Sequence, residues 1–92
     1  MYKLFVEYRI APELRQSFME WMAQAKLRES GFLIYEGTDQ PGLFVEVWEA
    51  ASEAEAERKK EERCGERSSW SVMFGYVSGG RDKVHAWTFR PV

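Results

Sequence analysis

Four short segments of this chain alternate between two kinds of side chain with the period of a β-strand. Successive side chains of a strand point to opposite faces of a sheet, so each segment has one aliphatic face and one face that mixes aromatic and charged groups. The mixed face carries Phe5, Glu7, Arg9, Leu33, Tyr35, Phe44, Glu46, Trp48, His85, Trp87 and Phe89. The pattern predicts a sheet with one aliphatic face and one face whose aromatic and charged side chains can contact a ligand or a partner.

Strands are predicted at residues 2–10, 32–36, 43–49 and 83–89, with an antiparallel hairpin around the turn at Pro41-Gly42. Pro12 favours a helix start, and apolar residues then recur at helical spacing up to Gly31. Ser52 and Glu55 match a capping box that opens a second helix over residues 53–63, which has few apolar residues and is expected to lie exposed. A short helical segment over residues 70–77 is expected to anchor this helix to the sheet.

The predicted order is β-α-β-β-α-β, the ferredoxin-like arrangement of the α+β class, with residues 1–92 as a single domain. Both helices should cover one face of a four-stranded antiparallel sheet. We expect the aliphatic strand faces to pack under the helices. The aromatic and charged face would then be left open.

Charge and hydropathy limit the partners of such a sheet. A formal net charge of −2 provides no positive field for a phosphate backbone, and Glu7 and Glu46 on the mixed face argue against a sheet that stacks RNA bases. Lys3, Glu7 and Arg9 interrupt the first apolar stretch, and no apolar run approaches the length of a membrane span. The sequence predicts a soluble, cytoplasmic protein without nucleic-acid or membrane partners.

Cofactor motifs are lacking as well. Cys64 is the single cysteine and has no companion at metal-ligand spacing, and no Gly-rich phosphate loop follows a strand. The sequence therefore predicts neither a metal site nor a bound cofactor. Four Trp, four Tyr and six Phe are a heavy aromatic load for 92 residues, which favours burial against a second subunit or a ligand.

His85 and Glu46 are the candidate catalytic residues. His85 is the one side chain whose ordinary pKa lies near neutral pH, although a strand His can equally serve packing. Glu7 and Glu46 are expected on the same side of neighbouring strands, where one of them could have a raised pKa; Arg9 could instead pair with either at a subunit interface.

Aromatic residues form the candidate substrate wall. Trp48 and Trp87 offer flat faces on which an aromatic molecule could stack, and Phe5, Tyr35 and Phe44 could complete the wall beside Glu7 and Arg9. The alternative for these aromatic residues is that they belong to the core or to a subunit contact.

The segment Phe44-Val-Glu-Val-Trp48 and the capped helix after it resemble the dimeric α+β barrel proteins, which include the antibiotic-biosynthesis monooxygenases. The resemblance implies a homodimer whose sheets meet through their open faces. It departs in several respects. Arg58, Lys59 and Lys60 stand where members often carry a His, and the only His of this chain lies in the last predicted strand. The haem-degrading and quinone-forming branches also use an Asn, and this chain contains none. Their chemistry therefore cannot be transferred residue by residue.

Two functions remain open from the sequence. The first is a small dimeric protein that binds an apolar or aromatic molecule, with a cofactor-independent monooxygenase or isomerase as the activity implied by the resemblance. The second is a non-catalytic interaction domain whose aromatic sheet face is the subunit interface.

Overall fold

One antiparallel sheet with the strand order β2-β3-β1-β4 organises the molecule. The computed structural model describes residues 1–92. In chain order the elements are β1 (Tyr2–Arg9), α1 (Arg15–Arg28), β2 (Phe32–Glu36), β3 (Leu43–Ala50), α2 (Glu53–Cys64) and β4 (His85–Phe89), with short 3₁₀ segments η1 (Pro12–Leu14), η2 (Ser69–Tyr76) and η3 (Arg81–Lys83). The predicted ferredoxin-like β-α-β-β-α-β order of the α+β class is confirmed.

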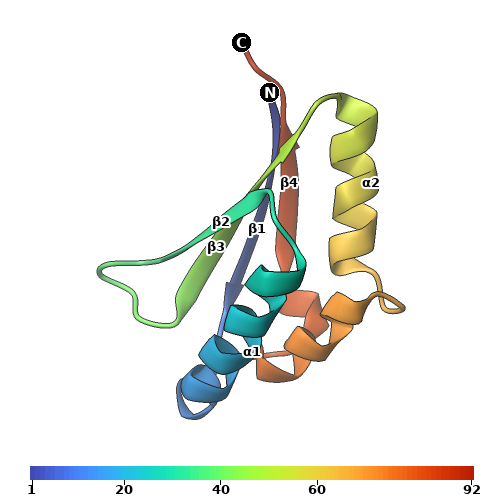
Figure 1. Ribbon diagram of the computed structural model, residues 1–92. Coiled ribbons are helices and arrows are strands. Elements are labelled where there is room, and N and C mark those ends of the chain that lie inside the picture. Colours follow the sequence, from blue (N-terminus) through green and yellow to red (C-terminus); the bar gives the residue numbers. More distant parts are fainter.

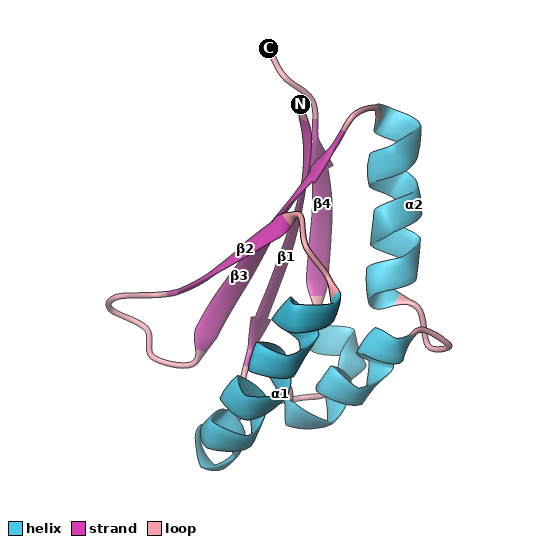
Figure 2. Ribbon diagram, in the orientation of Figure 1, coloured by secondary structure: helices cyan, strands magenta, loops and turns pink.

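All helical segments lie on one side of the sheet (Figure 1; Figure 2). α2 runs alongside β4 and β1, and η2 packs against both α2 and α1. The hairpin loop between β2 and β3 extends away from both helices (Figure 1). No helix is long and apolar enough to cross a membrane.

Local sequence signals account for the helix ends. The turn that begins at Pro12 is a 3₁₀ turn, so the regular helix starts at Arg15, later than predicted. The Ser52 hydroxyl accepts the Glu55 backbone N–H at 3.1 Å, and the Glu55 carboxylate accepts the backbone N–H of Ala51 at 2.9 Å. The Ser52 hydroxyl thus satisfies one of the free donors at the start of α2, and Glu55 binds the backbone of the residue before the cap.

The core fills the space between the sheet and the helical layer. Its twelve buried side chains are Leu4, Val6, Tyr8, Ile10, Phe18, Met22, Ala25, Phe32, Phe44, Trp48, Met73 and Val77. The anchoring role predicted for the segment near residues 70–77 is visible here, because Met73 and Val77 are buried in this cluster. The segment is a 3₁₀ helix of eight residues, which is long for this type of helix.

Three strands present their faces as predicted. Leu4, Val6 and Tyr8 of β1 are buried under the helices. Leu33 and Tyr35 of β2, and Trp87 and Phe89 of β4, are exposed on the other side, which we call the open face. The open face also carries the odd-numbered residues Phe5, Glu7, Val45, Val47 and His85.

The prediction for β3 is wrong. Phe44, Glu46 and Trp48 lie under the helices, whereas Val45 and Val47 stand on the open face opposite Glu7 and Phe5. The physical reason is area: burying Phe and Trp removes more apolar surface from water than burying two valines. Since side chains alternate along a strand, Glu46 is carried into the core between them.

Candidate functional site

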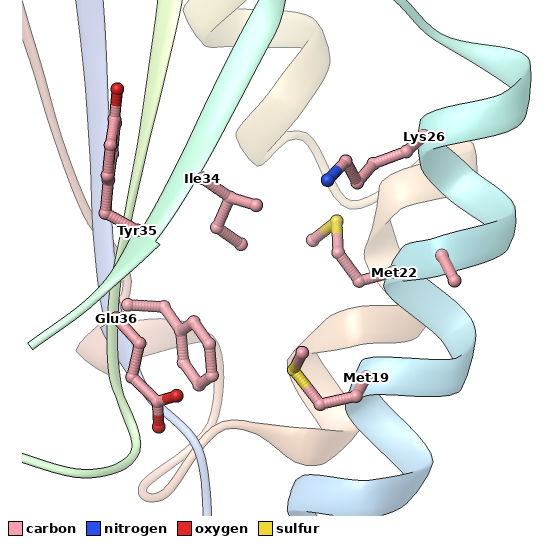
Figure 3. A pocket seen from close by; sticks show the side chains of 8 residues that line it. Met19, Met22, Lys26, Ile34, Tyr35 and Glu36 are labelled. Atoms are coloured by element: carbon pink, nitrogen blue, oxygen red, sulfur yellow. The ribbon is translucent and has the colours of Figure 1, made fainter.

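A cavity of about 270 Å³ lies between α1 and the neighbouring strands. We call it the α1 cavity; it is lined by Met19, Met22, Ala23, Lys26, Ile34, Tyr35, Glu36 and Phe44. Figure 3 shows Met22 facing Ile34 across it and Met19 at the level of Glu36, while the Tyr35 ring points away from α1. Most of the lining is apolar, which is typical of sites for small organic ligands, although the volume is at the small end for such sites.

Aromatic contacts with η2 hold α1 in its position. The Trp21 ring lies 5.6 Å from the Trp70 ring and 6.4 Å from the Tyr76 ring, measured between centroids. The Phe18 ring also contacts Tyr76, at 6.2 Å. Part of the aromatic surface of α1 is thus used on η2, and the cavity remains between the helix and β2.

An ion pair closes one end of the α1 cavity. Arg15 donates to both oxygens of Glu36, from Nε at 3.0 Å and from Nη2 at 2.5 Å, and the backbone N–H of Gly42 donates to the same carboxylate at 2.8 Å. The hydrogen bonds from Arg15, followed by the one from Gly42, lower the pKa of Glu36. Glu36 therefore accepts three hydrogen bonds as a carboxylate and ties the first turn of α1 to the end of β2.

A second feature under the helices is a buried polar cluster, the Glu46 cluster, made of Glu46, Arg63, Tyr8 and Trp48. Glu46 is 0% exposed and Arg63 is 2% exposed. Arg63 donates from Nε at 2.8 Å and from Nη2 at 2.5 Å to the two oxygens of Glu46. Trp48 Nε1 donates to Glu46 at 2.9 Å, and the Tyr8 hydroxyl donates to it as well.

Electrostatics keep the Glu46 cluster in this arrangement. Burial, and then the charge of Glu46, raise the pKa of Tyr8, which keeps its hydroxyl protonated as a donor. Burial acts to lower the pKa of Arg63, but the hydrogen bonds and charge of Glu46 outweigh it and the pKa is raised. The Arg63 guanidinium carbon lies 4.4 Å from the centroid of the Trp70 ring, a cation–π contact, and Nη1 is buried without a hydrogen-bond partner.

Two residues of the Glu46 cluster, Arg63 and Tyr8, were not among the predicted site residues. Arg63 stands seven residues after Ala56, two helical turns along α2, and these two are the buried residues of that helix. The spacing that places Arg63 on the same face of the helix as Ala56 is the sequence pattern that could have indicated its burial. Tyr8 lies on the face of β1 that the helices cover, so its ring belongs to the core while its hydroxyl reaches Glu46 of the neighbouring strand.

The predicted catalytic pair is not brought together. Glu46 is enclosed under the helices, while His85 stands exposed on the open face, where its register partner on β1 is Glu7. Glu7 and Glu46 likewise lie on opposite faces, because Glu7 pairs with Val45 of β3. Arg9 donates to Gln40 at 3.0 Å and forms no ion pair with either carboxylate.

Several other predicted residues gather on the open face. Glu7, Arg9 and His85 border a shallow cavity of about 360 Å³, together with Tyr8, Leu43, Ser78, Gly79 and Lys83. The His85 ring is stacked near Trp87 with 6.0 Å between centroids, and Phe5 meets Phe89 edge to face at 5.1 Å. We call the cavity that Glu7, Arg9 and His85 border the His85 cavity.

The predicted substrate wall is therefore divided between the two sides of the sheet. Trp87, Phe5 and the Tyr35 ring belong to the open face. Phe44 borders the α1 cavity, and Trp48 is stacked on Phe32 at 4.4 Å within the core. No group of three His, Cys, Asp or Glu side chains is placed to hold a metal ion.

Comparison with known proteins shows the fold. No protein-family model matches the chain, and no curated protein matches it. A crystal structure of an antibiotic biosynthesis monooxygenase superposes with a TM-score of 0.69 at 16% identity, covering 100% of this chain and 99% of the other. Structures assigned to the same activity from Nitrosomonas europaea (TM-score 0.70, 17% identity, coverage 100% and 99%) and Deinococcus radiodurans (0.65, 19%, 100% and 93%) are also similar. The chain has the fold of these proteins over its whole length.

Proposed function

We propose that the protein binds a small apolar or aromatic molecule in the α1 cavity. The observation that carries the proposal is an open space of about 270 Å³ between a helix and a sheet, lined mostly by apolar side chains. Its lining is mostly apolar and part of it is exposed to solvent, so a small molecule can enter and bury apolar surface there.

Filling the cavity tests this function. Ala23 lines the α1 cavity, so Ala23→Phe places a ring inside it without removing any core contact. Gln24→Phe is the matched control, because Gln24 is the next residue of α1, is exposed and does not line the cavity. With 2-naphthol as the probe in calorimetry, we expect binding to the wild type and to Gln24→Phe and loss of binding in Ala23→Phe. Equal binding by all three proteins would refute the proposal.

We also propose that two copies of the chain associate through their open faces. Leu33, Tyr35, Trp87 and Phe89 are each about half exposed there, which leaves a large apolar area in contact with water. Trp87→Ala should weaken the dimer in light scattering at micromolar concentration. Leu27→Ala, which removes an exposed side chain from α1, should leave the dimer unchanged. A wild type that is monomeric under these conditions would overturn this part.

A second candidate function is oxygenation without a bound cofactor. It is supported by the similarity of the fold to antibiotic biosynthesis monooxygenases. In such a reaction an electron-rich quinol supplies the electrons, one oxygen atom of O2 enters the product and the other leaves as water. His85, in the His85 cavity, would transfer the proton.

Oxygen uptake with quinols tests this candidate and locates the chemistry. If the reaction takes place at the open face, His85→Ala should lower the rate about 100-fold and Ala23→Phe should leave it unchanged. If it takes place in the α1 cavity, the two variants should show the reverse. A dimer that neither binds 2-naphthol nor consumes oxygen would be the non-catalytic interaction domain, with the open face as its subunit interface.

A further inference from the structure

An unpaired lysine borders the α1 cavity. Lys26 lies in the last turn of α1, one turn after Met22, and takes part in none of the five ion pairs of the molecule. Lys3 and Lys59 each have a carboxylate partner. Lys26 differs from the other unpaired lysines because it lines a mainly apolar space. In Figure 3 its nitrogen reaches toward β2, near Ile34 and Met22.

The two charged residues that line the α1 cavity, Lys26 and Glu36, lie at its opposite ends. Glu36, the one acidic residue that lines it, lies at the end away from Lys26 (Figure 3) and is occupied by Arg15 and by the backbone N–H of Gly42. Its negative charge is thus already balanced inside the protein. Lys26 contributes a positive charge that no protein group balances at close range, at the opposite end of an apolar space.

We propose that the ligand of the α1 cavity is an apolar monocarboxylate, a molecule with one aromatic or aliphatic body and one carboxylate that Lys26 binds. The inference rests on the proposed binding function and adds the class of ligand. The body lies between Met19, Met22 and Ile34, and the carboxylate accepts a hydrogen bond from the Lys26 ammonium. An ammonium prefers an ionised oxygen acceptor to a neutral one, which gives the cavity its selectivity.

The expected selectivity is modest. Lys26 is exposed to solvent, and ion pairs at exposed sites are weak and screened by salt. An apolar wall on one side of the pair excludes part of the water and strengthens it. We therefore expect an acid to bind about five-fold more tightly than its neutral amide, with the difference shrinking as salt is added.

The experiment compares 2-naphthoate with 2-naphthamide, which have the same ring and nearly the same shape. Wild-type protein should bind the acid about five-fold more tightly, and Lys26→Met should bind both equally while keeping its affinity for the amide. Lys26→Arg should retain part of the preference. Lys60→Met is the control, because Lys60 is unpaired and lies on α2, outside the cavity, and it should behave as the wild type.

Failure of this inference can be separated from failure of the proposed function. If both probes bind equally to the wild type and Ala23→Phe abolishes both, the cavity binds ligands but does not select carboxylates. A preference that survives Lys26→Met would also overturn the role of Lys26. If neither probe binds to the wild type, the proposed function itself is refuted, and the inference with it.

Discussion

The two helices cover the same face of the sheet with opposite results. Under α2 the space is filled by the Glu46 cluster, with Ala56 fully buried and Arg63 reaching the sheet. Under α1 a space of about 270 Å³ remains next to β2. The difference shows that a helix with a small buried residue and one long side chain can leave little space beneath it, here about 60 Å³ beside Arg63. Phe18 of α1 packs on the sheet, but Trp21 packs on Trp70 and Tyr76 of η2, and α1 stays apart from β2 beside the cavity.

The largest expected effect comes from removing the positive charge of Arg63, whose side chain lies in the space under α2. Arg63→Met leaves Glu46 buried without its cation and should lower the free energy of unfolding by about 3–5 kcal/mol in urea denaturation. Arg63→Met combined with Glu46→Leu removes both charges and should recover part of the loss, because the buried donors of Tyr8 and Trp48 then lose their acceptor. Arg58→Met, on the exposed side of α2, is the control. A single variant as stable as the wild type would contradict the structure of the cluster.

Enlarging one small residue under each helix compares the two spaces directly. Ala56 is 0% exposed, so Ala56→Leu should cost about 2 kcal/mol in the free energy of unfolding because of overpacking. Ala23→Leu extends into the α1 cavity and should change it by less than about 0.5 kcal/mol. Equal losses in the two variants would mean that α1 is as closely packed as α2.

The hydroxyl of Tyr8 tests a single bond of the Glu46 cluster. Tyr8→Phe keeps the ring contacts with Phe18 and Phe44 but removes the donor to the Glu46 carboxylate. Since hydrogen bonds to charged groups are stronger than neutral ones, we expect a loss of about 1.5 kcal/mol in urea denaturation. Tyr35→Phe, at an exposed position, should leave the free energy of unfolding unchanged. An unchanged free energy of unfolding in Tyr8→Phe would exclude the bond.

The smallest expected effect concerns the ion pair at the end of the α1 cavity. The pKa of Glu36 is lowered in the folded protein, so its contribution to stability is present above the ordinary glutamate value of 4.5 and is lost as the pH falls through the folded pKa. Glu36→Gln should therefore be less stable than the wild type at neutral pH, and the gap should close in acid. Glu29→Gln, without an ion pair, should show a gap at neither pH. A Glu36→Gln gap that persists in acid would contradict the assignment.

Much of the fold could be predicted from local signals. Alternation located all four strands, and Pro41-Gly42 and the Ser52 cap located the hairpin and the start of α2. The candidate sites were harder to predict. Of the predicted substrate residues, Tyr35 and Phe44 alone border the α1 cavity, and the Tyr35 ring points away from it. Met19 and Lys26 carried no signal, since a cavity depends on where one element stops short of another.

The sequence alone indicates which residues share a face of each strand, because the alternation of side chains every two residues is a property of the strand backbone. It did not determine which face of β3 meets the helices, because alternation looks the same from either side. Packing between elements sets this orientation: Phe44 and Trp48 bury more apolar area than the two valines between them, and Arg63 of α2 is in place to neutralise Glu46. A buried carboxylate is tolerated where a partner from another element satisfies it, and that partner lies seventeen residues away in the chain.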